Sequence, residues 1–128
     1  MSNFILDGIM GLAVADALGV PVEFESRDSL SKNPVVGVRA YGTYNQPAGT
    51  WSDDTSMTLA LADSLARGLN YNDIMENFIK WYEYGEFTPH GEVFDVGIAT
   101  TKALLRYKEG VFPLKCGGKN ELDNGNGS

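Results

Sequence analysis

The sequence predicts a helical protein in a single domain, residues 1–128, on three observations. Four segments carry apolar residues at helical spacing: 3–19, 52–67, 73–84 and 95–108. Glycine and proline residues lie between these segments, and only a short stretch after the first helix is expected to be extended. A chain of 128 residues, 43% of them apolar, is long enough for one folded domain.

Residues 3–19 form the first predicted helix, with Ile5, Ile9 and Leu12 as an apolar stripe. Asp16 continues this stripe, and it lies near the helix C-terminus, where the helix dipole disfavours negative charge. We therefore expect Asp16 to be a buried hydrogen-bond anchor. The alternative is a supporting residue beside a bound cation.

Residues 20–25 are expected to be extended. Glu23 lies there between two apolar neighbours, so in strand geometry its side chain points away from both and toward solvent. Residues 26–51 form a long irregular connection, and connections of this length are often lids or binding loops. Tyr41 and Tyr44 in this loop are candidates for the wall of a ligand site.

Ser52 is predicted to cap the helix over 52–67, with Asp53 and Asp54 in its first turn. This pattern is typical of an ordinary helix start. Asp54 shares a helix face with three apolar residues, Met57, Leu61 and Leu65. We expect that face to pack inward, so the Asp54 carboxylate would need a partner such as a divalent cation. Hydroxyl and carboxylate oxygens suit a hard ion such as Mg²⁺ or Ca²⁺ rather than zinc.

The remaining two predicted helices have asparagine, aspartate or threonine at their starts. Asn72 is expected to cap the helix over 73–84, and Asp95 or Thr88 the helix over 95–108. The first of these helices has the apolar spacing of a buried face, and we interpret its aromatic residues as core.

Composition excludes several functions. The net charge of −7 disfavours nucleic acid and anionic membranes as partners. We find no apolar run of the roughly 18 residues expected of a membrane span and no basic segment ahead of the first apolar residues, so no signal peptide is expected. A single cysteine, Cys116, fits the reducing cytoplasm. No Ser/His/Asp or Cys/His arrangement for nucleophilic catalysis is present.

Three stretches of this sequence together resemble the ADP-ribosylglycohydrolase family, the group that includes dinitrogenase reductase-activating glycohydrolase. Residues 11–24 are similar to the family's opening helix and G-x-P-x-E-F turn. Residues 47–57 contain Ser-Asp-Asp-Thr, similar to the family's T/S-D-D-T metal motif. Residues 123–128 look like the start of its asparagine- and glycine-containing substrate loop.

The resemblance implies an all-α helical bundle around a cleft that holds two Mg²⁺ or Mn²⁺ ions. It implies three metal ligands from this part of the chain: Ser52, Asp53 and Asp54. Glu23 would contact the second metal or its water and act as a gate over the distal ribose, so that Glu23, Asp53 and Asp54 serve catalysis. Four further residues would lie beside the ADP-ribose phosphates or ribose: Gly125, Asn126, Gly127 and Ser128.

The activity implied is metal-dependent hydrolysis of the glycosidic bond between ADP-ribose and an acceptor, either an ADP-ribosylated protein side chain or a small molecule. Family members are longer and carry a D-x-D-T motif toward their C-terminus, which this sequence lacks. We therefore expect the chain to be the N-terminal part of the enzyme, completed by a C-terminal segment or chain. The alternatives are a non-catalytic ADP-ribose- or metal-binding or structural relative and, more weakly, a metal-dependent phosphohydrolase.

Overall fold

The computed structural model describes residues 3–120 and residue 123, and within them the chain is helical without a strand. Eight elements follow one another: α1 (Phe4–Gly19), η1 (Val20–Val22), α2 (Arg27–Lys32), η2 (Gly42–Tyr44), α3 (Asp53–Leu65), α4 (Tyr71–Tyr84), α5 (Ile98–Lys108) and η3 (Pro113–Lys115). The all-α prediction is confirmed, as are helices close to each of the four predicted ranges. The predicted substrate-loop residues Gly125, Asn126, Gly127 and Ser128 lie outside the described part of the chain.

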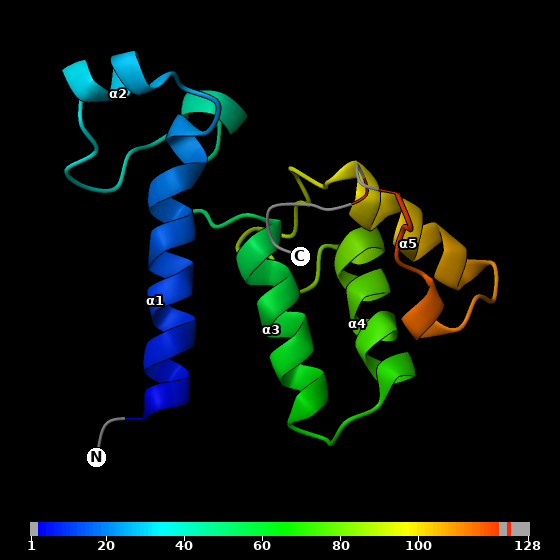
Figure 1. Ribbon diagram of the computed structural model, residues 1–128. Coiled ribbons are helices and arrows are strands. Elements are labelled where there is room, and N and C mark those ends of the chain that lie inside the picture. The colour runs from blue at the N-terminus through cyan, green and yellow to red at the C-terminus, as the bar shows by residue number, and fades with distance from the viewer. Residues whose placement is uncertain (1–2, 121–122, 124–128) are drawn as a thin grey trace.

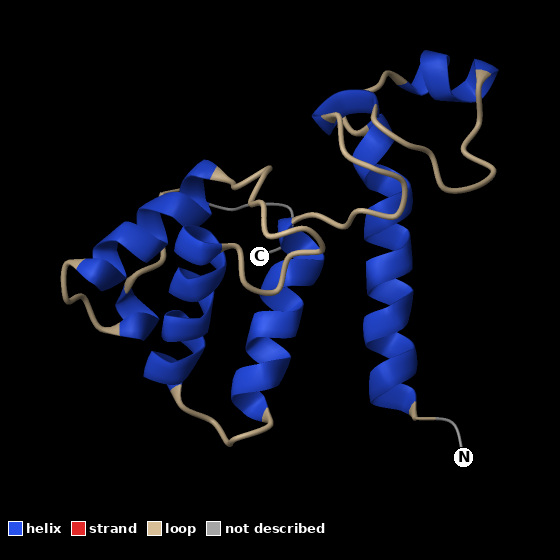
Figure 2. Cartoon of the chain, turned by 180° about the vertical axis from the view of Figure 1, so that it is seen from behind, coloured by secondary structure: helices blue, strands red, loops and turns tan. Residues whose placement is uncertain are grey.

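Helices α3 and α4 form an antiparallel pair, α5 packs beside α4, and α1 stands along the opposite side of α3 (Figures 1 and 2). The hydrophobic core is centred on α4, α5 and the η3 region, with Met75, Trp81, Leu104 and Cys116 buried together. This core lies on one side of α3. Helix α1 therefore contacts the rest of the molecule mainly through α3 and through the η1 turn, which packs against η2.

The buried face of α3 differs from the predicted one. Its buried residues are Thr55, Ser56, Ala60 and Ser64, whereas Asp54 and Leu65 are exposed. The expectation that Asp54 shares an inward-packed face ending at Leu65 is therefore wrong. The reason is that α3 is packed through small and hydroxyl side chains, which allow close approach to its neighbours but do not stand out in a hydrophobic pattern.

Two predicted helix starts are also shifted. Helix α4 begins at Tyr71, and its cap is Asn70, whose side-chain oxygen accepts hydrogen bonds from the backbone N–H groups of Asn72 (3.0 Å) and Asp73 (3.2 Å). Helix α5 begins at Ile98 after Gly97, which provides no side-chain cap, so neither Asp95 nor Thr88 has the predicted capping role. Asparagine and aspartate occur both as caps and in turns, so the sequence alone did not select between them.

The segment after α1 is wound rather than extended. Val20–Val22 form one turn of 3₁₀ helix, with Pro21 in the first turn, where its missing N–H group costs nothing. The chain then turns sharply at Phe24, which has a positive φ of 63°. This turn places Glu23 beside the start of α3 instead of in the predicted solvent-facing strand position.

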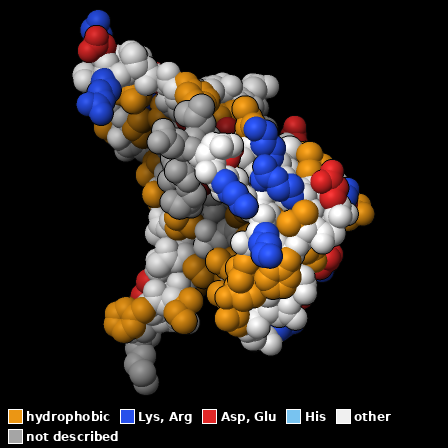
Figure 3. Space-filling view, turned by 45° about the vertical axis from the view of Figure 1, so that its right-hand side comes forward, with side chains coloured by type: hydrophobic (Ala, Val, Ile, Leu, Met, Phe, Trp, Pro, Cys, Tyr) orange, Lys and Arg blue, Asp and Glu red, His pale blue; other side chains and the backbone are white. Residues whose placement is uncertain are grey.

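Most of α1 is uncovered. Ala17 is the only buried residue of this helix, and six large apolar side chains are exposed: Phe4, Ile5, Leu6, Met10, Leu12 and Val14. In Figure 3, orange hydrophobic side chains lie at the surface on the side of the molecule that α1 forms. The residues Phe4–Val22 form one helical stretch long and apolar enough to cross a membrane by length and composition alone. The expectation that no apolar run reaches that length is therefore corrected.

Candidate functional site

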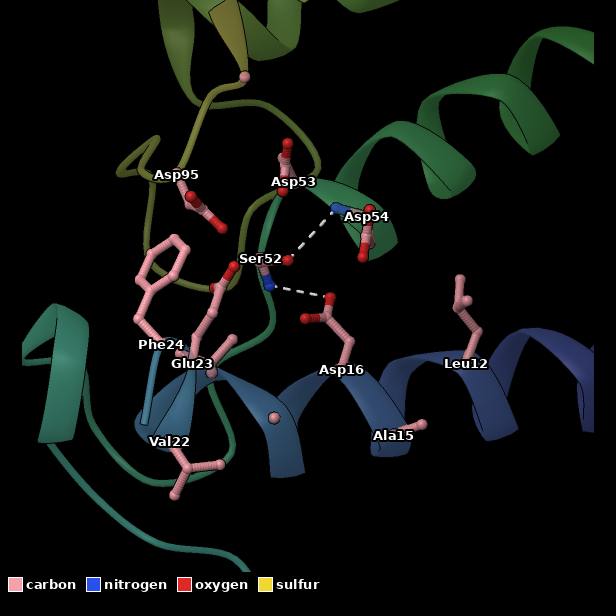
Figure 4. Close-up of a pocket in the computed structure, with 13 residues that line it drawn as sticks. Leu12, Ala15, Asp16, Val22, Glu23, Phe24, Ser52, Asp53, Asp54 and Asp95 are labelled. Atoms are coloured by element: carbon pink, nitrogen blue, oxygen red, sulfur yellow. Dashed lines mark hydrogen bonds between the residues drawn. The ribbon is translucent and has the colours of Figure 1, made fainter. Parts of the chain in front are cut away.

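A cavity of about 780 Å³ lies between the C-terminal half of α1, the start of α3 and the segment before α5 (Figure 4). Five carboxylates line it: Asp16, Glu23, Asp53, Asp54 and Asp95. Ser52 adds a hydroxyl, and Leu12, Ala15, Val22 and Phe24 give it an apolar side. Within the described residues, no lysine, arginine or histidine belongs to its lining.

Ser52 confirms its predicted place as the N-cap of α3. Its side-chain oxygen accepts a hydrogen bond from the backbone N–H of Asp54 (3.3 Å), and its carbonyl accepts one from the Ser56 hydroxyl (2.9 Å). The residue is buried, so its place at the helix start is fixed by the protein interior. The next two residues, Asp53 and Asp54, consequently project from the first helical turn into the cavity.

Asp16 holds this helix start in place from across the fold. A single oxygen of its carboxylate, Oδ2, accepts hydrogen bonds from the Ser52 N–H (2.9 Å), the Thr55 N–H (3.2 Å) and the Thr55 hydroxyl (2.6 Å). The Ser52 bond is one of the dashed lines in Figure 4. The predicted role of Asp16 as a hydrogen-bond anchor is confirmed, and the side chain serves as a second N-terminal cap supplied by another helix.

Glu23 faces the cavity rather than bulk solvent. Its backbone carbonyl accepts a hydrogen bond from the Thr43 hydroxyl (2.7 Å), which ties the turn after η1 to η2. Burial raises the pKa of the Glu23 carboxyl, and the nearby charges of Asp95 and Asp54 raise it further. In Figure 4 the carboxylates of Glu23 and Asp95 point toward each other.

Asp95 is a site residue that the sequence reasoning missed, since it was expected to be a helix cap. It has a positive φ of 57°, a conformation that aspartate tolerates better than most residues, and this backbone turn aims its side chain into the cavity. The preceding Phe94 packs against Tyr44, with ring centroids 5.2 Å apart, and this contact fixes the segment. No spacing in the sequence distinguishes this aspartate from a cap, because the two uses differ only in the tertiary placement of the loop.

The cavity concentrates negative charge that no described basic side chain neutralises. Burial, together with the charges of Asp95 and Asp54, raises the pKa of Asp53 to about 7. Burial and the charges of Asp16 and Asp95 likewise raise the pKa of Asp54. The buried Tyr44 hydroxyl has no hydrogen-bond partner among the described residues. Burial raises the pKa of this hydroxyl above its ordinary value, and the neighbouring Asp95 and Glu23 carboxylates raise it further. A bound cation would relieve these unfavourable interactions.

The chemical type of the donor atoms at this site fits a hard divalent cation. Ser52, Asp53, Asp54, Glu23 and Asp95 offer oxygen atoms only, which suits Mg²⁺ or Mn²⁺ and not a sulfur- or imidazole-bound metal. In the described part of the chain, however, no three acidic, histidine or cysteine side chains are close enough together to hold one ion. The coordination shell of a cation bound here would therefore include water or further protein groups.

The fold and the site define a helical protein with an acidic cavity built on the N-terminus of a helix. The model of the family described as ADP-ribosylglycohydrolase matches residues 2–128. The chain therefore belongs to the ADP-ribosylglycohydrolase family.

Three curated relatives share this similarity. An ADP-ribosylarginine hydrolase, Tri1, of Serratia proteamaculans is 41% identical over 101 residues, which cover 77% of this chain and 27% of that protein. Its counterpart of Pseudomonas putida is 40% identical, over 80% of this chain and 28% of that protein. The ADP-ribosyl-[dinitrogen reductase] glycohydrolase of Rhodospirillum rubrum is 34% identical, over 80% of this chain and 34% of that protein.

A solved structure supports the fold. A chain of an ADP-ribosylglycohydrolase-related protein complex superposes with a TM-score of 0.65 and 36% identity, covering 80% of this chain and 32% of that one. The present chain thus spans between about a quarter and a third of the length of these proteins.

Proposed function

We propose that this cavity binds Mg²⁺ or Mn²⁺ and forms part of a site that hydrolyses the glycosidic bond between ADP-ribose and an acceptor. The observation that carries the proposal is the convergence of five carboxylates and Ser52 on one cavity whose described lining holds no positive side chain. The reaction is inferred from the family and from the names of its members, which act on ADP-ribosylarginine or on ADP-ribosyl-dinitrogen reductase. The proposed substrate is accordingly an ADP-ribosylated protein side chain. A small molecule of the ADP-ribose type is the other class of substrate that we propose.

In this proposal the residues at the start of α3 are the metal donors. Ser52, Asp53 and Asp54 present their oxygens from a helix start that Asp16 and Thr55 hold rigid, and two ions are proposed in all. A divalent cation supplies positive charge that orients ribose hydroxyls and activates water for attack. Asp53, with its raised pKa, would lose its proton on cation binding, so binding would be coupled to proton release.

Glu23, on the turn after η1, and Asp95, in the segment before α5, line the same cavity and have a different proposed role. Bond cleavage at the anomeric carbon passes through a sugar with oxocarbenium character. Carboxylates fixed beside that carbon stabilise the developing positive charge without reorganisation. Glu23 lines the cavity from the turn after η1, and we propose that its side chain also covers the sugar.

We further propose that protein groups beyond the described residues complete this site. Two observations support this. The chain spans only 27% and 34% of the length of the Serratia and Rhodospirillum relatives, and the described acidic groups do not by themselves assemble a three-residue metal cluster. The proposed completing groups come from a segment equivalent to the remaining length of the relatives.

Metal binding tests the first part of the proposal. Titration of the chain with Mn²⁺, followed by isothermal calorimetry and the Mn²⁺ paramagnetic resonance signal, is expected to show saturable binding that Asp54→Asn abolishes or weakens at least about tenfold. Asp7→Asn is the matched control, because it removes the same charge from an exposed position outside the cavity. Absence of Mn²⁺ binding, or equal binding by both variants, contradicts the proposed metal site.

Hydrolysis is tested separately, with the chain mixed with the unmatched remainder of the Serratia relative and Mg²⁺. Release of ADP-ribose from an ADP-ribosylarginine peptide is the expected result, and Asp54→Asn is expected to remove it. Binding of ADP-ribose with no release would instead identify the non-catalytic alternative, and free phosphate as product would identify a phosphohydrolase.

A further inference from the structure

The hydroxyl of Tyr44 is a buried polar group to which the described residues offer no hydrogen bond. Burying a hydroxyl without a partner costs free energy, and buried polar groups of folded proteins are nearly always bonded. The sequence made Tyr44 a candidate for the wall of a ligand site, but it is absent from the described lining of the acidic cavity. Its hydroxyl lies instead beside the carboxylates of two lining residues, Glu23 and Asp95. Any role of this hydroxyl in the site is therefore exerted through one of these carboxylates.

We propose that Tyr44 is a positioning residue of the acidic site, whose hydroxyl donates a hydrogen bond to the Glu23 carboxylate and so fixes where that carboxylate lies in the cavity. This inference deepens the proposed function and rests on it for the role that Glu23 has toward the sugar. The hydrogen bond itself requires neither cation nor substrate. It can therefore be tested in the chain alone.

Element η2, which carries Tyr44, is packed on the turn that carries Glu23. The Thr43 hydroxyl donates a hydrogen bond to the Glu23 carbonyl (2.7 Å) and a longer one to the Pro21 carbonyl (3.5 Å). Gly42 has a φ of 59°, and a Cβ at this position would lie 2.0 Å from the Pro21 carbonyl oxygen, so the two turns are in direct backbone contact. These contacts involve the residues next to Tyr44, and they hold it and Glu23 together.

The ring of Tyr44 is also held by a second segment. Its centroid lies 5.2 Å from that of Phe94, with the two ring planes inclined at 47°. Tilted aromatic pairs at this separation are favourable, and Phe94 directly precedes Asp95 in the chain. The ring is thus fixed between the segment of Glu23 and the segment of Asp95.

Of the two neighbouring carboxylates, we assign Glu23 as the acceptor. Burial raises the pKa of the Glu23 carboxyl, and the Tyr44 hydroxyl opposes this shift, because a donated hydrogen bond favours the charged form. Burial raises the pKa of the Tyr44 hydroxyl itself, which therefore keeps its proton and remains a donor at neutral pH. The Glu23 side chain has one more rotatable bond than that of Asp95, whose backbone is held at a φ of 57°. Glu23 is consequently the acceptor that can turn to meet the hydroxyl.

The hydrogen bond matters to the site because Glu23 and Asp95 point toward each other in the cavity (Figure 4). Two carboxylates at close range repel when both are ionised. A hydroxyl holds one of them by a charge-assisted hydrogen bond without bringing a further charge into the cavity. A carboxylate fixed in this way needs no reorganisation when positive charge develops on the sugar. Tyr44 thereby supplies the fixed orientation that the proposed role of Glu23 requires.

A double-mutant cycle measures this hydrogen bond in the full 128-residue chain without metal. Tyr44→Phe keeps the ring beside Phe94 and removes only the hydroxyl. In the wild-type background it is expected to raise the equilibrium constant for urea unfolding at least about fivefold, because a hydrogen bond to a charged acceptor is lost. In the Glu23→Ala background it is expected to leave that constant unchanged or to lower it, because the hydroxyl there has no acceptor and phenylalanine is buried at less cost.

Tyr41→Phe is the matched control, since Tyr41 lies in the same loop and its side chain is 60% exposed. It is expected to change the unfolding constant by less than about twofold in both backgrounds. A lower unfolding constant for Tyr44→Phe in the wild-type background would show that the hydroxyl is unbonded, and it would overturn the proposal. Equal effects in the two backgrounds, or coupling to Asp95→Ala instead of Glu23→Ala, would overturn the assignment of Glu23 as the acceptor.

Carbon-13 NMR of the chain labelled at the tyrosine Cζ atoms gives a readout that a purely structural role of the ring would not change. The chain has six tyrosines, and the Tyr44 signal is identified by its absence from Tyr44→Phe. Glu23→Ala is expected to shift this signal, because Cζ responds to hydrogen bonding of the attached hydroxyl. Asp95→Ala, which removes a neighbouring charge of the same sign, is expected to shift it less. A Tyr44 signal that Glu23→Ala does not move contradicts the hydrogen bond.

Failure of this proposal and failure of the proposed function give different results. Coupling between Tyr44 and Glu23 in a chain that shows no saturable Mn²⁺ binding contradicts the metal site alone. Saturable Mn²⁺ binding by the wild type, together with no coupling between these two residues, contradicts the positioning role alone.

Discussion

Removal of the Asp16 carboxylate is expected to destabilise the start of α3 more than any other single change on α1. Oδ2 accepts three hydrogen bonds, from the N–H groups of Ser52 and Thr55 and from the Thr55 hydroxyl. Thr55 is fully buried and Ser52 nearly so, so water cannot readily replace the lost acceptor. A hydrogen bond to a charged group contributes about 1.5 kcal/mol or more, and each unsatisfied buried donor costs a similar amount.

Three such bonds give roughly 4 kcal/mol, and partial access of water to the half-buried Asp16 reduces this to ~3 kcal/mol for Asp16→Ala. Asp16→Asn keeps an oxygen acceptor but loses its charge, so we expect a smaller loss of about 1–1.5 kcal/mol. Urea unfolding followed by circular dichroism measures both free energies of unfolding.

Glu92→Gln serves as the control for Asp16→Asn, because it removes the same charge from an exposed loop position and should change stability by less than ~0.5 kcal/mol. The reasoning is refuted if Asp16→Ala costs no more than Glu92→Gln. It is also refuted if Asp16→Asn and Asp16→Ala are equally destabilising, since the retained acceptor would then contribute nothing.

Two further predictions concern the acidic site and the turn after α4. The folded-state pKa of Asp53, about 7, is above its ordinary value, so the folded protein binds more protons and stability falls as pH rises from about 4 to about 7. Thermal melts of the wild type at about pH 5 and pH 8 should show this loss of stability, which we expect to be ~1 kcal/mol after solvent screening. The stability of Asp53→Asn should change less between the two pH values, and an identical change in the wild type and the variant would contradict the prediction. Gly85→Ala should cost more than about 2 kcal/mol in urea unfolding, because Gly85 has φ of 70° and an added Cβ would lie 2.2 Å from the Gly91 carbonyl oxygen. Gly68→Ala, also at positive φ but with open space around it, should cost only about 1 kcal/mol, and equal losses would rule out the steric explanation.

The sequence alone identified the end of the candidate site that lies at the start of α3. Ser52, Asp53 and Asp54 follow local rules, since a capping hydroxyl and first-turn acids satisfy orphan N–H groups whatever surrounds the helix. The sequence also predicted the type of role that Asp16 has. A carboxylate that continues an apolar stripe near a helix C-terminus requires a specific partner, and the partner proved to be the start of α3.

The family resemblance implied a role for Glu23 in that site, but only the tertiary structure showed how Glu23 reaches it, and only the tertiary structure placed Asp95 there. Glu23 reaches it because the chain winds into a 3₁₀ turn at Val20–Val22 instead of extending, and Asp95 reaches it through a positive φ held by the packing of Phe94 on Tyr44. Such placements depend on contacts between segments distant in sequence, which neither periodicity nor capping rules encode. The same holds for α1: its sequence predicted a helix, whereas the uncovered state of its apolar surface was visible only once its neighbours were in place.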